Sequence, residues 1–299
     1  MNFSLIKVYH RILTVPIRRA DGETQFFIDN RLMVLTDFHI HSNFSDGKHS
    51  IPEIVDYYGS RGFGAISITD HLCEQNTFLG KAAAYLEKTL TPATFPLYLE
   101  ILKSETERAW SRYRMTVIPG VEITKNSLSN HRSAHILGIG ISEYVSADQS
   151  IENILKSLKN QGALTIAAHP VSTRKIEKQT LHLWSRKEEL APLFDAWEVG
   201  CGMHFFEEVA RSRLPTIANT DLHRFSQMTG WKSMLHTRKS EKKQAALLDA
   251  VRAQQLSFHY YKDLEVQLGT IPFPHPSHSP LAIFPQFDGR GHTDLISAT

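Results

Sequence analysis

The chain has 299 residues, 41% of them hydrophobic, and a formal net charge of +2. That length is enough for one large α/β barrel or for two smaller domains. A charge so close to neutral provides no strongly basic face for duplex nucleic acid. Two cysteines are too few for a disulfide scaffold, and no apolar run reaches the roughly 20 residues that span a bilayer. We therefore expect a cytoplasmic protein without a membrane segment.

Residues 1–33 are predicted to form an N-terminal appendage. Ile12–Ile17 and Gln25–Ile28 have the pattern of a hairpin with Asp21-Gly22 as its turn. The basic residues ahead of this turn give the segment some resemblance to an organellar transit peptide. Pro16 and the β-branched residues favour an added strand or arm instead.

From Leu32 onward, short apolar runs alternate with segments of helical pattern. Seven runs are predicted to be strands buried on both faces, as in a parallel sheet that helices cover. In chain order they are Met33–Phe38, Ala65–Thr69, Thr116–Val121, Ala134–Ile139, Ala163–Ala167, Ala196–Val199 and Thr216–Ala218.

Helices are predicted between these strands. Ser50-x-x-Glu53 has the pattern of a capping box, and Ser150 precedes a run whose apolar residues follow the helical period. The predicted helices are one that begins after Ser50, then Leu97–Arg114, Ile151–Gln161, Phe205–Arg213 and Ser240–Gln255.

Strands separated by helices imply right-handed β-α-β units. Seven such strands predict an α/β fold, an irregular (βα)7 TIM-like barrel over residues 34–269, with the functional site at the rim of carboxyl strand ends. The Pro-rich tail, residues 270–299, cannot be regular structure. It is either a loop over the barrel or a disordered end.

Metal-binding residue types recur at the ends of the predicted strands. His39 and His41 are two residues apart, so both imidazoles project to one face, and Asp37 could orient one of them from behind. Glu122, with two oxygens, is the natural bridge between adjacent ions. Mixed imidazole and carboxylate ligands suit a cluster of divalent transition metals. The full set is His39, His41, Asp46, His71, Glu122, His135, His169, Asp221 and His223.

Each of these residues also has a simpler explanation. A single His at a strand end is commonly buried and hydrogen-bonded, Asp46-Gly47 is an ordinary turn pattern, and Glu122 could be a surface charge. These explanations would have to hold independently at every position, so we interpret the set as a metal centre. Cys73, two residues after His71, is either a further ligand or, as we favour, a small buried thiol.

Six motifs resemble those of the PHP family, the polymerase and histidinol phosphatase metallohydrolases. They are Asp37-Phe-His39-Ile-His41-Ser42, Phe44-Ser45-Asp46-Gly47, Ile68-Thr69-Asp70-His71, Pro119-Gly120-Val121-Glu122, Ala168-His169-Pro170 and Asn219-Thr220-Asp221-Leu222-His223. The resemblance runs from about Leu35 to about His223 and fills all nine ligand positions. It departs from the family at Leu72, where the usual residue is polar.

The resemblance implies a distorted seven-stranded barrel with two or three divalent ions, usually manganese, iron or zinc. It implies one ion on His39, His41, Glu122 and Asp221, a second on Glu122, His135 and His169, and a third on Asp46, His71 and His223. The residues expected to serve catalysis as well are His39, His41, Asp46, His71, Glu122 and Asp221.

Clustered divalent ions lower the pKa of bound water to about 7 and can clamp the oxygens of a displacement at phosphorus. The sequence has neither a Gly-x-Ser-x-Gly elbow nor a phosphate-binding Gly-x-x-x-x-Gly-Lys loop. We therefore expect a metal-dependent phosphoesterase that hydrolyses a phosphomonoester or a nucleotide or oligonucleotide phosphate with metal-activated water. His71 or Asp70 could carry the proton. The alternative is a non-catalytic or regulatory PHP barrel whose metals are structural.

Substrate recognition is predicted less directly. Cationic side chains after the ligand strands could meet a phosphate, although solvated loop charges are the alternative. The candidates are Lys125, Arg132, Arg174, Lys175 and Arg224, of which Arg174 and Arg224 are selected. The aromatic side chains that could stack on a base, or simply pack the barrel, are Phe38, Phe44, Phe225 and Trp231.

Family members that act on nucleoside bisphosphates and short RNA ends typically carry a small inserted domain between the motifs of His135 and His169. The intervening segment has room here for only a strand and one helix. We therefore expect that this domain is absent.

Overall fold

The computed structural model describes residues 15–18, 24–28, 31–126, 133–171, 181–238 and 244–263. The predicted turn at Asp21-Gly22 and the predicted tail, residues 270–299, lie outside these ranges. The strands are β1 (Val15–Arg18), β2 (Thr24–Ile28), β3 (Arg31–Asp37), β4 (Ala65–Ile68), β5 (His71–Cys73), β6 (Thr116–Lys125), β7 (Ala134–Ile139), β8 (Leu164–Ala167), β9 (Ala196–Cys201), β10 (His204–Phe205), β11 (Thr216–Asn219), β12 (Gly230–Arg238) and β13 (Leu256–Tyr261). The α-helices are α1 (Ile51–Gly59), α2 (Phe78–Tyr85), α3 (Phe95–Tyr113), α4 (Ile151–Asn160), α5 (Leu181–Ser185), α6 (Lys187–Leu190), α7 (Glu207–Arg211) and α8 (Gln244–Arg252).

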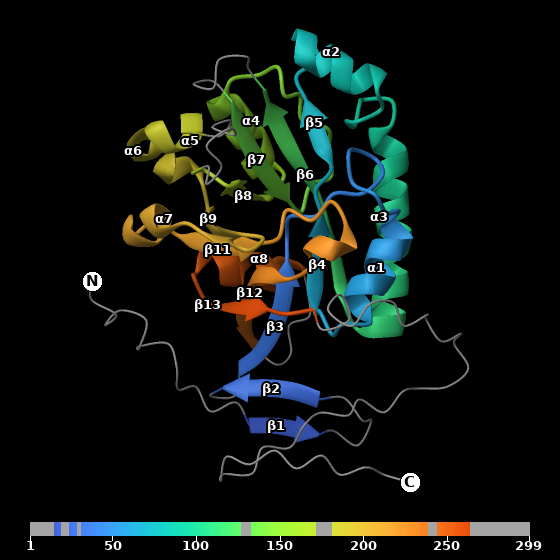
Figure 1. Ribbon diagram of the computed structural model, residues 1–299, viewed down its shortest axis with the longest axis vertical. Helices are drawn as coiled ribbons and strands as arrows, with labels where there is room; N and C mark the ends of the chain where they lie inside the picture. The colour runs from blue at the N-terminus through green and yellow to red at the C-terminus, as the bar shows by residue number, and fades with distance from the viewer. Residues whose placement is uncertain are drawn as a thin grey trace. The chain divides into compact units, whose positions relative to one another are not determined.

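The strands form a curled sheet flanked by helices, which confirms the predicted α/β class (Figure 1). β3 pairs in parallel with β4, β4 with β6, β8 with β9, and β9 with β11. β1 and β2 form the predicted antiparallel hairpin, and β2 continues it onto β3. Every one of the seven predicted strands is present, so the apolar runs were sufficient to locate them.

The first and last of these seven strands meet where the sheet curls around. Ile40, which follows β3, and Leu222, which follows β11, form an isolated parallel bridge. The His41 N–H donates to the Leu222 carbonyl at 2.8 Å, and the Leu222 N–H donates to the His39 carbonyl at 3.1 Å. The sheet is therefore curled into a partial barrel. Residues distant in sequence lie side by side at the end of the sheet where β3 and β11 stop.

The predicted alternation of strand and helix is wrong at β7. This strand runs antiparallel to both of its neighbours, β6 and β8. The physical reason is the short connection between Lys125 and Ala134, because a crossover between parallel strands needs a dozen residues or more. The sheet is consequently mixed rather than a uniform set of (βα) units.

β12 and β13 were not predicted. β12 pairs with β3 along residues 31–36 and with β13 on its other side, both antiparallel. Its neighbouring residues Lys232 and Ser233 face opposite sides of the sheet, and both are fully buried. Buried polar residues hide the apolar alternation by which a strand is recognised.

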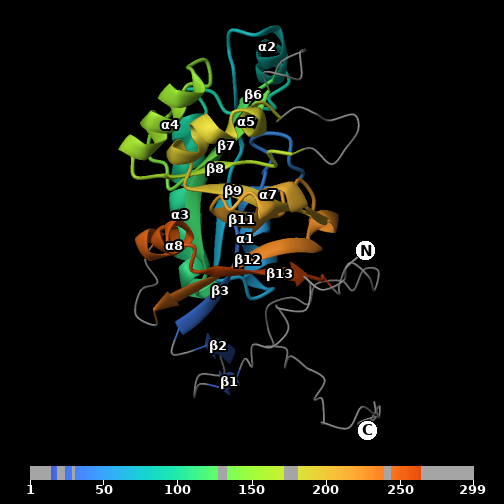
Figure 2. The ribbon, with the colours of Figure 1, turned by 90° about the vertical axis from the view of Figure 1, so that its left-hand side faces the viewer.

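The longer predicted helices are present with small shifts at their ends, and the short α2, α5 and α6 were not predicted. Figure 1 shows α1 and α3 side by side along β4 and β6, and Figure 2 shows α4 beside β8 and α8 beside β12. The Ser150 hydroxyl accepts from Asn153 N–H at the start of α4, and Glu53 accepts from Ser50 N–H at the start of α1. The expected helix starts are thus fixed by their predicted caps.

Between His135 and His169 the structure contains the remainder of β7, then α4 and β8. This confirms that no small domain is inserted there. No helix within the described ranges combines the length and the apolar character needed to cross a membrane.

Replacement of Leu158 by alanine tests how strongly α4 holds the sheet. Leu158 is fully buried and lies so close to Gly138 of β7 that a Cβ there would be 2.5 Å from its Cδ2. We expect Leu158→Ala to lower the free energy of unfolding by about 2–5 kcal/mol in urea denaturation. Lys156→Ala, at an exposed position of the same helix, should change it by less than about 0.5 kcal/mol. Equal effects of the two substitutions would contradict this packing.

Candidate metal centre

Glu122 of β6 lies at the centre of the predicted ligand residues and is fully buried. Its Oε1 is 3.0 Å from His135 Nδ1 and 3.4 Å from both His39 Nε2 and His169 Nε2. Its Oε2 is 2.9 Å from His71 Nδ1. The two carboxylate oxygens therefore face different sets of imidazoles, which is the geometry expected of a bridging ligand.

Asp221 is a second carboxylate that contacts histidines of the cluster. Its Oδ1 is 3.3 Å from His39 Nε2 and 3.2 Å from His41 Nε2. The Asp221 backbone has a φ of 58°, which is uncommon outside glycine. The preceding residue, Thr220, donates both its N–H and its hydroxyl to the buried Asp37 carboxylate. These bonds hold the turn that points Asp221 at the two histidines.

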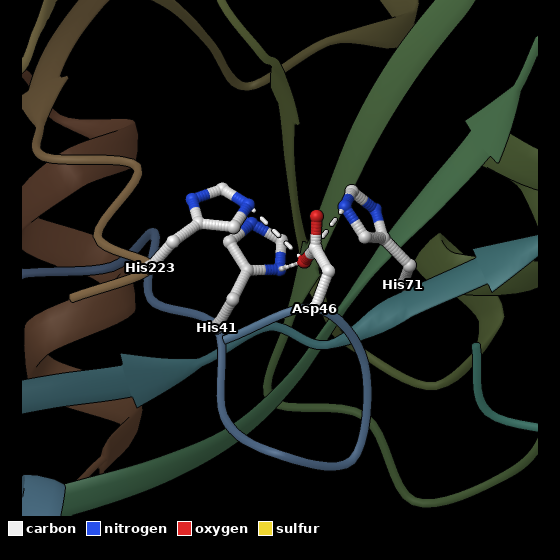
Figure 3. Close-up of side chains that lie close together, drawn as sticks. All are labelled: His41, Asp46, His71 and His223. Carbon is white, nitrogen blue, oxygen red and sulfur yellow. Dashed lines mark ion pairs between the residues drawn. The ribbon is translucent and has the colours of Figure 1, made fainter. Parts of the chain in front are cut away.

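Asp46 is the third carboxylate of the cluster, and Figure 3 shows it between three imidazoles. Its Oδ1 lies 3.1 Å from His223 Nε2, 3.5 Å from His71 Nε2 and 3.9 Å from His41 Nδ1. The Asp46 side chain is 41% exposed, whereas those of His39 and His41 are 0% exposed. The cluster is therefore open to solvent on the Asp46 side and closed at its base.

The loop that carries Asp46 is fixed from beneath by Asp70. The Asp70 carboxylate accepts hydrogen bonds from the Ser42 N–H and from the hydroxyls of Ser42 and Ser45, at 2.8, 2.6 and 2.5 Å. Gly47 is required in the same loop, because a Cβ there would lie 2.2 Å from the His41 carbonyl oxygen. Asp70 is fully buried and both of its oxygens accept hydrogen bonds from this loop, so its visible role is to place the loop.

All nine predicted ligand residues thus come together, and the structure shows how closely they group. Three groups of described residues bring one ligand atom per residue within 4.8 Å of each other. They are His41, Asp46, His71 and His223; His39, Glu122 and His169; and His39, His41 and Asp221. The resemblance implied a similar division, but here His41 also joins the Asp46 group, and His135 contacts Glu122 without joining a group.

The groups have buried ligand atoms with no hydrogen bond among the described residues. These atoms are His39 Nε2, His41 Nδ1, His41 Nε2, Asp46 Oδ1 and Glu122 Oε2. Leaving such an atom unsatisfied in the interior costs about 1–3 kcal/mol. Imidazole nitrogens and carboxylate oxygens gathered in this way fit divalent transition metals, so the residues present match the group that the motifs imply.

Burial and neighbouring charges set the protonation of the cluster. Burial lowers the pKa of His41 to about 3, with a further contribution from the nearby His71, so this imidazole is neutral and able to bind a metal. Burial opposes the ionisation of Glu122, but the surrounding His135, His39 and His71 outweigh it and hold the Glu122 pKa well below its usual range. The central carboxylate is therefore an anion.

The predicted role of Asp37 as a support for a histidine is wrong, and the supporting residue Glu198 was not predicted. Asp37 was expected to orient a ligand histidine, but its carboxylate accepts from Tyr58 and Thr220 instead. The His39 imidazole is supported by Glu198, whose Oε1 lies 3.0 Å from His39 Nδ1. The available signal was a single acidic residue inside the apolar run Ala196–Val199, since a carboxylate is almost never fully buried without a partner.

Cys73 and Lys125 do not belong to the centre. Cys73 is buried and outside the three groups formed by the described residues, in agreement with the favoured explanation of a buried thiol. The Lys125 ammonium donates to Glu74 and to the carbonyls of Ala147 and Gln149, so it holds two loops together.

Of the other side chains predicted to contact substrate, one cation is exposed beside the centre, and the aromatic ones pack against protein. Arg224 is exposed immediately after His223, whereas Arg132, Arg174 and Lys175 lie outside the described residues. The candidate aromatic side chains pack against protein. Phe38 is fully buried, and the Phe225 ring stacks on His49 and Tyr57 with centroids 3.6 and 3.7 Å away. Phe44 meets the edge of Tyr98, and Trp231 lies against Phe205 and Tyr260.

Comparison with known proteins agrees with the motifs. Residues 37–161 match the family model described as the PHP domain. Phosphoribosyl 1,2-cyclic phosphate 1,2-diphosphodiesterase of Eggerthella lenta is 24% identical over 110 residues, which are 37% of this chain and 32% of that protein. The chain thus aligns with about a third of the length of this curated relative.

Two solved structures share the fold. A two-domain protein of Bacteroides vulgatus that contains a predicted PHP-like metal-dependent phosphoesterase aligns with a TM-score of 0.58 and 18% identity, over 78% of this chain and 66% of its own. PsfC from Pseudomonas syringae aligns with a TM-score of 0.50 and 14% identity, over 77% of this chain and 92% of its own. Both similarities concern the fold, and the family match confirms the resemblance for the motifs that lie within residues 37–161.

The His223–Asp46 contact predicts a pH dependence of the chelator-treated protein. Burial lowers the pKa of His223, but the close contact with the Asp46 carboxylate and the charge of Asp221 outweigh it and raise that pKa to about 9. A raised pKa means that protonated His223 stabilises the fold below pH 6.5 and that this contribution is lost as the pH rises through 9.

We expect the stability advantage of wild type over His223→Gln to fall by roughly 2 kcal/mol between pH 6 and pH 10, after allowance for the exposure of Asp46. Urea denaturation at each pH measures it. The control is His204→Gln, at an exposed position, whose difference from wild type should stay constant. An advantage of wild type over His223→Gln that grows with pH would reverse the predicted sign.

Proposed function

We propose that this chain, which contains a PHP domain, is a metal-dependent phosphoesterase that hydrolyses a phosphomonoester or a nucleotide or oligonucleotide phosphate. The observation that carries the proposal is the set of buried nitrogen and oxygen ligand atoms that converge without hydrogen-bond partners among the described residues. A protein that kept these residues only for folding would pair them. The proposal therefore assigns the cluster to a bound cofactor and a reaction.

Two or three divalent ions, manganese, iron or zinc, are proposed as the cofactors. The residues that would hold them are His39, His41, Asp46, His71, Glu122, His135, His169, Asp221 and His223, with Glu122 as the bridge. When bound, such ions supply a Lewis acid for a phosphoryl oxygen and lower the pKa of coordinated water towards about 7.

The protein's own contribution is position and charge. His39 and His41, at 0% exposure, form the base of the centre, whereas the side chains of His223 and Asp46 are 24% and 41% exposed. A substrate phosphate therefore approaches from the Asp46 side. The anionic Glu122 and Asp221 would hold the metal ions, and the burial of His39 and His41 keeps the base of the site away from solvent.

Arg224 is the described cation that we propose meets the substrate. It directly follows His223, and the N–H groups of both residues donate to the Gln227 side chain at 2.8 Å. This shared acceptor fixes the backbone there, and the Arg224 side chain is exposed. Arg174 is proposed for the same role and lies outside the described residues.

The ester is assigned only to a class. The Eggerthella lenta relative is a diphosphodiesterase by name, which is a reason to include phosphodiesters among the substrates tested. The proposed partners are thus small phosphorylated molecules, including nucleotides and short oligonucleotides.

Hydrolysis of p-nitrophenyl phosphate and bis(p-nitrophenyl) phosphate with added Mn²⁺ tests the proposal. We expect Asp221→Asn and His39→Ala each to reduce kcat/KM more than about 100-fold, because loss of a ligand should exceed the effect of losing a supporting residue. Asp249→Asn, an exposed position on α8 that pairs with Arg252, is the control and should match wild type. A chelator should abolish the activity, and added Mn²⁺ should restore it.

Unchanged hydrolysis in both ligand variants would rule out catalysis at this centre. If the protein binds Mn²⁺ but hydrolyses neither compound nor any member of a phosphometabolite and oligonucleotide panel, the regulatory barrel with structural metals replaces the proposed enzyme.

A further inference from the structure

We propose that Glu198 is a positioning residue that orients two metal ligands at once, the imidazole of His39 and the backbone of His169. This inference rests on the proposed metal centre and goes beyond it by assigning the residue that prepares the ligands. Glu198 lies in the middle of β9 and is fully buried. Its Oε1 is 3.0 Å from His39 Nδ1, and its Oε2 accepts the His169 N–H at 2.7 Å.

The neighbouring amide shows that Glu198 acts as an acceptor. The Asn219 Oδ1 accepts the Phe38 N–H at 2.9 Å, so this oxygen must face Phe38. The Asn219 Nδ2 then faces Glu198 and donates to its Oε1 at 2.9 Å. Each oxygen of Glu198 thus faces at least one N–H donor, which is the environment of an ionised carboxylate.

An ionised carboxylate can only accept, so the His39 Nδ1 must carry the hydrogen. The other nitrogen, Nε2, points towards Glu122 and Asp221 at 3.4 and 3.3 Å and has no hydrogen bond among the described residues. A histidine binds a metal through a neutral nitrogen, and a hydrogen bond from its other nitrogen to a carboxylate fixes the ring and its tautomer. Glu198 therefore presents Nε2 of His39 to the metal centre.

The second contact supports an unusual backbone. His169 has a φ of 26°, a conformation that non-glycine residues seldom adopt and that surrounding structure must hold. The bond from its N–H to Glu198 Oε2 provides such a hold at the residue itself. The His169 Nε2 lies 3.4 Å from Glu122 Oε1. Glu198 therefore positions two candidate ligands, His39 after β3 and His169 after β8.

Glu198→Gln separates this role from simple packing, because glutamine has the same shape but only one acceptor oxygen. If that oxygen faces His39 and Asn219, the amide NH2 faces the His169 N–H, and donor meets donor. If the amide is turned, the His39 Nδ1–H loses its acceptor. Either arrangement releases one of the two ligands.

Zinc affinity, measured by competition with a chelating dye, is the test. We expect Glu198→Gln to weaken Zn²⁺ binding by about 10- to 100-fold, the effect typical of residues that support metal ligands. The control is Glu105→Gln on α3, a buried carboxylate that pairs with Arg108 away from the centre, and its Zn²⁺ affinity should equal that of wild type. Unchanged affinity in Glu198→Gln, or equal weakening in both variants, would overturn the inference.

A measurement on the wild-type protein makes the test independent of how the variant folds. Nitrogen NMR of the zinc-loaded protein, labelled at histidine and assigned with His39→Ala, should show the His39 hydrogen on Nδ1. A hydrogen on Nε2 would overturn the inference.

The experiments distinguish failure of the proposed phosphoesterase activity from failure of the role assigned to Glu198. Weakened Zn²⁺ binding in Glu198→Gln together with an inactive wild type would reject the phosphoesterase and keep Glu198 as a positioning residue. A wild type that binds neither Zn²⁺ nor Mn²⁺ would reject both.

Discussion

The structure depends on one electrostatic constraint, which is that a buried carboxylate stays ionised only if positive or hydrogen-donating groups surround it. Glu122 meets this constraint because strands β3, β7 and β8 bring His39, His135 and His169 around its Oε1. The same constraint makes the arrangement incomplete, since buried ligand atoms have no hydrogen bonds among the described residues. Fold and metal chemistry are therefore parts of one balance of charge.

Other buried carboxylates accept hydrogen bonds from the residues that carry the candidate ligands. Glu198 faces His39 and His169, Asp37 holds Thr220 ahead of Asp221, and Asp70 holds the loop of Asp46. None of these carboxylates belongs to the three ligand groups, yet each fixes an element that carries a ligand. The positions of the candidate ligands thus depend on residues outside the three groups, as is general for metal sites.

The sequence predicted what is encoded locally and missed what is encoded by distant pairing. His39 and His41 could be recognised because their spacing on one strand is itself the signal. Asp37 was assigned to the wrong partner, since nothing near it in the sequence reveals that Thr220, distant along the chain, donates to it. The direction of β7 and the existence of β12 were missed because a loop length and buried polar residues outweighed the simple hydrophobic pattern.

The bridge between Ile40 and Leu222 has a consequence for the order of folding. The family match ends at residue 161, and each of the three ligand groups contains a residue beyond it, namely His169, Asp221 or His223. The two groups that contain Asp221 or His223 stay incomplete until β11 has docked beside β3, a contact between segments far apart along the chain. Contacts of such long range form slowly, because the entropy of closing the loop must be overcome first. These two ligand groups are therefore completed late, and their completion reports that β3 and β11, the first and last of the seven predicted strands, have met.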